Sequence, residues 1–262
     1  MKSIEVVPPI IVALDVPNIN IARRVVDSLT PLGPDHVAYQ VRAPYVHTDF
    51  MHELIDDGYF VIGAMRYSDA PKKMSGDILA TFHPTDEHDK PRSLPHAITV
   101  TAPKTTDVQE LACLTRTIKN IHLRTIPKPG PVTMGRNSKP KNLKVNPSLI
   151  ATARPEDFHH SDHEQIGEQA LLSHNRAQSV GIDSCEILFN GLEVFLERKG
   201  DISGINIVVS KLSLSGLNIR VAAKRAYMQG ADSILLGESV IERVRRKRSP
   251  IPYVEKVLAA QL

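Results

Sequence analysis

Short apolar runs alternate with amphipathic stretches along almost the whole sequence, and this alternation limits the fold more than any other feature. The runs are rich in Val, Ile and Leu and have the length of buried parallel strands. We predict strands at 10–16, 36–41, 60–65, 97–101, 121–125, 185–189, 205–210 and 233–237. We predict helices at 19–29, 48–57, 70–82, 106–118, 156–180, 192–199, 218–229 and 253–261. This order predicts an α/β protein with one domain over residues 1–262, a (β/α)8 TIM barrel, with an open doubly wound sheet as the alternative.

Composition excludes several other classes of protein. Of the 262 residues, 42% are hydrophobic and 23% are charged, which is typical of a globular chain rather than a disordered one. The apolar run at 6–14 is too short to span a membrane. The two cysteines, Cys113 and Cys185, form no CxxC pair, and we predict that both pack in the core. We therefore expect a cytoplasmic protein without membrane contact.

One long segment departs from the regular alternation. We predict a Pro-rich insertion at about 127–158 after the fifth strand, since six of the 19 prolines lie in 127–155. A segment there would lie at the carboxyl ends of the strands, where barrel active sites are found, and would be placed as a lid. The alternative is a connection that touches no ligand. Residues 111–155 also carry nine basic side chains and no acidic one. Because they hold no aromatic side chain that could stack on bases, we do not expect nucleic acid to be the partner.

Two stretches resemble a known family. Residues 10–17 read Ile-Ile-Val-Ala-Leu-Asp-Val-Pro, and a predicted helix follows at once. Residues 64–69 read Ala-Met-Arg-Tyr-Ser-Asp at the end of the third predicted strand. The first resembles the opening of the orotidine 5'-monophosphate decarboxylase superfamily, and the second its Asp-x-Lys-x-x-Asp motif. The resemblance assigns four catalytic positions, which hold Asp15, Gln40, Arg66 and Asp69 in this chain.

The resemblance also shows where the chain departs from the family. Gln40 and Arg66 stand where the family has lysines, and Ala64 stands where it has an aspartate. Arginine keeps the charge but is a poor acid, because its pKa lies above about 12. The resemblance therefore implies a barrel that binds a phosphorylated ribose or nucleotide without ordinary decarboxylase activity, in a binding, regulatory or structural role. Without the family pattern, Asp15 and Asp69 are ordinary turn residues.

Two alternatives remain open. One is an active decarboxylase or related phosphate-sugar lyase, a carbon-carbon lyase that uses Asp15, Arg66 and Asp69. The other is an anion- or nucleic-acid-binding protein acting through the basic segment 111–155.

A second resemblance lies in the last quarter of the chain. Ser215-Gly216 and Gly237-Glu238 resemble the ends of the seventh and eighth strands of phosphate-binding barrels. Their residues and spacing are most similar to those of indole-glycerol-phosphate synthase. There, glycine lets phosphate oxygens approach backbone N–H groups at a helix N-terminus. The resemblance therefore implies a site for a nucleotide or sugar phosphate at these four residues. Glu238 stands where the decarboxylases have an arginine that holds the phosphate.

The remaining expectations concern partners and metals. The resemblance implies a homodimer in which Asp69 reaches the active site of the partner subunit. We expect no cofactor. His159, His160 and His163 stand close together at the start of a predicted helix, but such spacing is more typical of a polar helix start than of a metal site.

Overall fold

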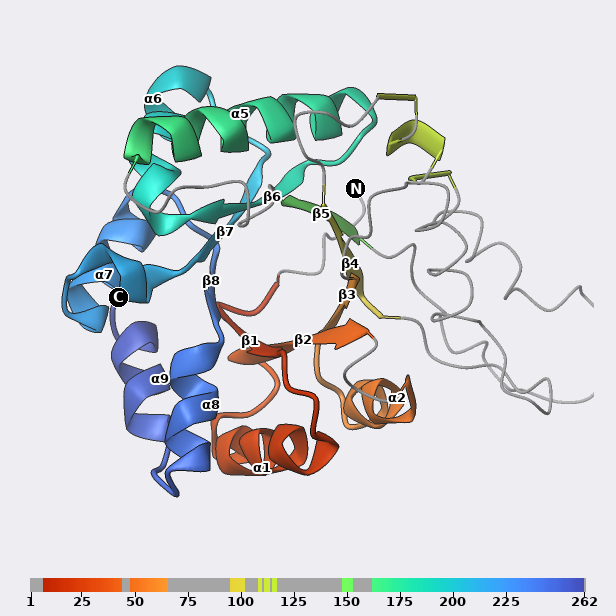
Figure 1. Ribbon diagram of the computed structural model, residues 1–262, viewed down its shortest axis with the longest axis vertical. Helices are drawn as coiled ribbons and strands as arrows, with labels where there is room; N and C mark the ends of the chain where they lie inside the picture. The colour runs from red at the N-terminus through yellow and green to blue at the C-terminus, as the bar shows by residue number, and fades with distance from the viewer. Residues whose placement is uncertain are drawn as a thin grey trace, which may run out of the picture.

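The predicted TIM barrel is confirmed (Figure 1). The computed structural model describes residues 7–43, 48–65, 95–101, 108–109, 111–113, 115–116, 148–152 and 162–261. Within them, parallel strands close into a barrel in sequence order from β1 to β8. The strands are β1 Ile10–Leu14, β2 Val37–Ala43, β3 Val61–Met65, β4 Ala97–Thr101, β5 Ser148–Thr152, β6 Ser184–Leu188, β7 Asn206–Ser210 and β8 Ser233–Leu236.

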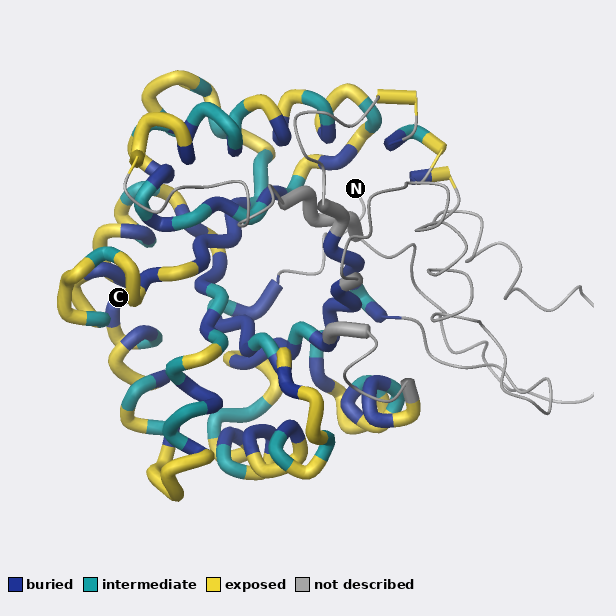
Figure 2. The backbone as a smooth tube through the Cα atoms, in the orientation of Figure 1, coloured by how far each residue is buried: buried dark blue, intermediate teal, exposed yellow. Residues whose placement is uncertain are grey.

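The described helices lie outside the sheet, and their outer faces are exposed while the strands are largely buried (Figure 2). They are α1 Ile19–Leu29, α2 Thr48–Asp56, α5 His163–Ser179, α6 Leu192–Lys199, α7 Ile219–Met228, α8 Glu238–Arg245 and α9 Ile251–Leu258. Short 3-10 turns are η1 Thr30–Leu32, η3 Phe189–Gly191 and η4 Leu212–Ser215. The side chain of Asn18 caps α1 by accepting a hydrogen bond from the backbone N–H of Asn20 at 2.9 Å. No helix in the described part of the chain has the length and apolar character that crossing a bilayer requires.

The fifth strand corrects the sequence prediction. β5 is Ser148–Thr152, which pairs with β4 on one side and with β6 on the other. The range 121–125, predicted to be this strand, lies outside the described residues. The prediction was wrong because the prolines on both sides of 148–152 made that stretch resemble a loop. Residues 127–147 therefore precede β5, so the prediction that the whole segment follows the fifth strand was wrong. The lid stays a prediction, because 127–147 lie outside the described residues.

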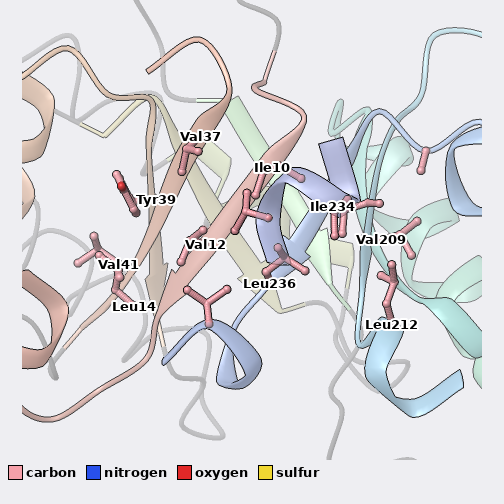
Figure 3. Close-up of a cluster of buried hydrophobic side chains, with 14 of the residues drawn as sticks. Ile10, Val12, Leu14, Val37, Tyr39, Val41, Val209, Leu212, Ile234 and Leu236 are labelled. Atoms are coloured by element: carbon pink, nitrogen blue, oxygen red, sulfur yellow. The ribbon is translucent and has the colours of Figure 1, made fainter. Parts of the chain in front are cut away.

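Alternation along the strands separates two apolar layers. The side chains that point toward the helices form the larger layer, which includes Val12 of β1, Tyr39 of β2 and Val209 of β7 (Figure 3). Those that point into the barrel form a smaller cluster: Val7, Ile11, Ala38, Ile62, Ala97 and Val208. Each strand thus has one face in each layer, and its residue numbers show which side chains face the interior.

Hydrogen bonds from the last quarter of the chain close the barrel on its first strand. The backbone N–H of Ile234 donates to the carbonyl of Pro9 at 2.8 Å. The Ser233 hydroxyl donates to the carbonyl of Pro8 at 2.9 Å, and the Tyr227 hydroxyl donates to that of Pro9 at 3.0 Å. Side chains therefore add to the backbone ladder at the seam between β8 and β1.

Candidate functional site

The candidate site lies inside the barrel, toward the carboxyl ends of the strands. Two residues beyond each member of the inner cluster that lies on a strand, the side chain again faces inward. These positions form what we call the upper layer: Ala13, Gln40, Ala64, Thr99, Ser210 and, from the partly buried Leu235, Gly237. Gln40, Thr99 and Ser210 make this layer partly polar, whereas the inner cluster is aliphatic, and it lies toward the end of the barrel at which TIM-barrel active sites lie.

A hydrogen bond between two neutral side chains crosses the upper layer. Gln40 of β2 donates from Nε2 to Oγ1 of Thr99 on β4 at 3.1 Å. Ala64 of the intervening strand β3 is paired in register with Thr99. Because Ala64 has only a methyl group, the amide can reach past β3 to the hydroxyl. Gln40 is half-buried and Thr99 is buried, so this bond forms in a partly dehydrated place.

The structure places two of the four predicted catalytic residues on neighbouring strands, Asp15 just beyond the end of β1 and Gln40 in the middle of β2. Asp15 follows directly after β1 and is exposed, and Gln40 pairs in register with Ala13 of β1. Arg66 and Asp69 lie outside the described residues. The described part of the predicted catalytic centre therefore consists of one carboxylate and one neutral amide.

Ser215 and Gly216 lie in the turn between β7 and α7. The Ser215 hydroxyl donates to the carbonyl of Leu212 at 2.7 Å and accepts from the backbone N–H of Leu217 at 3.1 Å. Gly216 ends the 3-10 turn with a φ of 70°, a left-handed conformation that favours glycine. Both residues thus have a local role in shaping this turn, while Asn218 caps α7 by accepting from the N–H of Arg220.

Gly237 and Glu238 lie at the other predicted phosphate position, at the start of α8. The carbonyl of Gly237 accepts from the N–H groups of Val240 and Ile241, and no side chain of the described residues caps this helix. The first N–H groups of an uncapped helix attract anions, and the helix dipole adds to that attraction. Glu238 is exposed rather than turned into the protein interior. Because β7 pairs with β8, the two glycine turns follow neighbouring strands.

Solved structures share this architecture along nearly the whole chain. Orotidine 5'-phosphate decarboxylase from Lactobacillus acidophilus has a TM-score of 0.63 at 17% identity, over 97% of this chain and 99% of that one. The fold is that of the orotidine 5'-phosphate decarboxylases. A conserved protein of Geobacillus kaustophilus, described as uncharacterized, has a TM-score of 0.59 at 16% identity, over 97% of this chain and 100% of that one. The orotidine 5'-monophosphate decarboxylase of Methanocaldococcus jannaschii, complexed with inhibitor BMP, has a TM-score of 0.59 at 14% identity, over 96% of this chain and 99% of that one.

The resemblance drawn from residues 10–17 and 64–69 is thus confirmed at the level of the decarboxylase fold. No protein-family model matches the sequence, and no curated protein matches it. The roles of individual residues consequently depend on their own geometry. At the position that the resemblance assigns to a lysine, the geometry is the hydrogen bond of Gln40 to Thr99.

The two cysteines have different surroundings. Cys185 is buried on the helix-facing side of β6, and burial raises the pKa of its thiol to about 12. The expected core position is confirmed there. Cys113 is exposed, so the expectation of a core position was wrong for this residue. Its neighbours Leu111 and Thr115 are buried, which shows that the helical stretch turns a different face inward.

The histidine cluster at the start of α5 shows no metal site in the described chain. The side chain of Asp162 caps α5 by accepting from the N–H of Gln165 at 3.0 Å. His163 is exposed, while His159 and His160 lie outside the described residues. Among the residues that the structure describes, no three His, Cys, Asp or Glu side chains gather as metal ligands would.

Two inward-facing polar residues were not predicted from the sequence. Glu186 is the central residue of β6, between two buried side chains that face the helices. Ser210 ends β7 in the upper layer and is buried. A charge inside an apolar strand is a sequence feature that could have identified Glu186. Ser210 had no comparable feature, because serine is common at strand ends.

Proposed function

We propose that this barrel binds a phosphorylated ribose or nucleotide and has lost the ordinary decarboxylation of orotidine monophosphate. One observation carries the proposal. Where the resemblance expects a lysine, Gln40 donates a hydrogen bond to Thr99 across the methyl group of Ala64. A neutral hydrogen bond thus occupies the place of one charged member of the family's network.

The chemistry explains why this exchange matters. Loss of carbon dioxide leaves negative charge on carbon, and the family stabilises that charge with an ammonium group that also delivers a proton. The resemblance assigns that ammonium to the motif lysine, whose place Arg66 takes, and arginine keeps the charge but is a poor acid. Gln40 takes the place of the family's second lysine, and its side chain has no charge. Ala64 supplies no carboxylate to position an ammonium. Removing one member of a preorganised electrostatic site typically lowers the rate by about 10²–10³-fold, and here several polar members differ.

The start of α8 supports the phosphate half of the proposal. Its first N–H groups have no side-chain cap, and Gly237 brings the backbone close to β1. A Cβ atom added at Gly237 would lie 3.7 Å from that of Ala13. The Methanocaldococcus jannaschii relative in fold was solved with inhibitor BMP, which makes BMP a suitable probe here.

A decarboxylation assay with orotidine monophosphate tests the loss of activity. We expect turnover far below the usual enzyme range of about 1–1000 per second. Turnover within that range would refute the proposal. The variant Gln40→Lys combined with Ala64→Asp serves as a comparison, because it restores two members of the family network.

Isothermal titration calorimetry with uridine monophosphate and with BMP tests binding separately. We expect saturable heat in the wild-type chain. Gly237→Asp, which adds a carboxylate at the start of α8, should abolish it, and Ser179→Ala at the exposed end of α5 should not. No heat at millimolar ligand would refute binding whatever the decarboxylation assay shows.

The homodimer stays part of the proposal through Asp69, which the resemblance places at the partner's active site. Light scattering tests it, and a monomer at micromolar concentration would remove this role from Asp69.

A further inference from the structure

Glu186 is a carboxylate on the inner face of the barrel. Its neighbours Cys185 and Ile187 are buried against the helices, so alternation turns Glu186 inward. It pairs in register with Val208 of β7, which belongs to the inner cluster. Glu186 is only half-buried, whereas its two neighbours are almost fully buried. Solvent therefore reaches the inner face of β6 more readily than its helix-facing side.

Ser210 provides an independent observation in the same place. Its side chain is 2% exposed, and its hydroxyl has no hydrogen-bond partner in the described part of the chain. Ile207 and Val209 face the helices, so alternation turns Ser210 inward. Buried hydroxyl groups are normally hydrogen-bonded, which makes an unpartnered one in a candidate site an indication of a ligand or a bound water.

The strand register brings these two groups together. Glu186 pairs with Val208, and Ser210 lies two residues beyond Val208 on the same strand. Both side chains therefore point into the barrel from adjacent strands, one position apart along the inner face. On its other side Ser210 pairs with Leu235, two residues before Gly237. The Glu186–Ser210 pair thus lies next to the helix start at which we place the phosphate.

We infer that Glu186 and Ser210 form a subsite for a hydroxyl group on the sugar or polyol part of the bound ligand. A ligand hydroxyl accepts the hydrogen of the serine and donates its own hydrogen to a carboxylate oxygen, so it gives the Ser210 hydroxyl a partner and adds one hydrogen bond at Glu186. A phosphate oxygen could accept from the serine but would meet only acceptor atoms at the carboxylate of Glu186. An ammonium group would donate to both side chains and leave the serine hydrogen without an acceptor. The inference rests on the proposed function, because it concerns the sugar part of the same phosphorylated ligand.

Binding of two probes tests the subsite. Ribose 5-phosphate and inorganic phosphate are titrated by calorimetry into the wild-type chain, Ser210→Ala, Glu186→Gln and the control Ser184→Ala at the opposite end of β6. We expect the first two substitutions to weaken ribose 5-phosphate binding about tenfold and to change phosphate binding less than about twofold, since one hydrogen bond to a charged group is at stake. The control should bind both probes as the wild type does.

The outcomes separate the two proposals. If Ser210→Ala and Glu186→Gln bind ribose 5-phosphate as tightly as the wild type, the Ser210 hydroxyl holds only a water and the subsite is refuted, while phosphate binding stands. If the wild type binds neither probe, the proposed function fails and the subsite fails with it. Ser210→Ala removes a hydroxyl that has no partner among the described residues, so its thermal midpoint should be no lower than that of the wild type. This stability makes its binding result interpretable.

Discussion

Acid sensitivity of the helix layer is predicted by one buried histidine. His174 lies on α5, is fully buried and stacks edge-on against Phe195 of α6 with ring centroids 5.8 Å apart. Neither ring nitrogen has a hydrogen-bond partner in the described structure. Burial, aided by the nearby charge of Lys199 and opposed by that of Asp183, lowers the pKa of His174 from 6.5 to about 4. The neutral ring is therefore the form that the folded chain accepts.

Acid lowers the stability of the fold because the folded and unfolded chains bind the His174 proton at different pH values. Between pH 6.5 and pH 4 the unfolded chain binds a proton that the folded chain does not, so acid favours unfolding. The contribution of His174 to the free energy of unfolding is complete above pH 6.5 and is lost as the pH falls through this window. With 1.36 kcal/mol for each pKa unit, the loss reaches about 2 kcal/mol at pH 5 and about 3 kcal/mol at pH 4.

Urea unfolding between pH 4 and pH 8 measures this loss. Between pH 7.5 and pH 5 we expect the free energy of unfolding to fall by about 2 kcal/mol less in His174→Phe than in the wild type. His163→Gln, at the exposed first residue of the same helix, should follow the wild-type curve. Parallel curves for His174→Phe and the wild type would show that the unfolding of this layer does not depend on the titration of His174.

Other substitutions and reagents test further features. Gly167→Ala should destabilise the fold by about 1–3 kcal/mol, since the added Cβ would lie 2.5 Å from that of Val194, and Gly237→Ala, with no contact closer than 3.7 Å, should cost less in thermal melts. At pH 8 a thiol reagent should label Cys113 in the folded chain and Cys185 only after unfolding, as read by peptide mass spectrometry; equal labelling would contradict the burial of Cys185. Thr99→Val should cost about 1 kcal/mol in urea unfolding, because it removes the acceptor of an inner hydrogen bond, and a neutral effect would show that water replaces it.

The sequence was sufficient to predict those helices and strands whose structure is determined by the local pattern of apolar residues. Helix α1 follows the spacing of Ala22, Val25, Val26 and Leu29, all of which are buried, and Asn18 caps it. Seven of the eight strands overlap their predicted ranges, because a strand buried on both faces is a continuous apolar run. The prediction of the fifth strand was wrong for the opposite reason. Ser148–Thr152 is short and stands among prolines, and only pairing with β4 and β6 identifies it as a strand.

The site was less predictable than the fold. Asp15 and Gln40 were found through resemblance, yet the hydrogen bond of Gln40 to Thr99 joins residues 59 apart in the sequence. Glu186 and Ser210 became candidates only when the strand register showed which face of each strand turns inward. Periodicity tells that two faces exist, and tertiary structure decides which of them meets the ligand.

The seam between β1 and β8 has a consequence for how the chain folds during synthesis. The Ser233 hydroxyl donates to Pro8 across a sequence separation of 225 residues, and the ladder at this seam joins Ile10–Val12 to Ile234–Leu236. One edge of β1 therefore remains unpaired until almost the whole barrel has left the ribosome. Unpaired strand edges invite association with other chains, and contacts of such long range form slowly. Newly made chains of this protein should accordingly depend on chaperones until β8 closes the sheet.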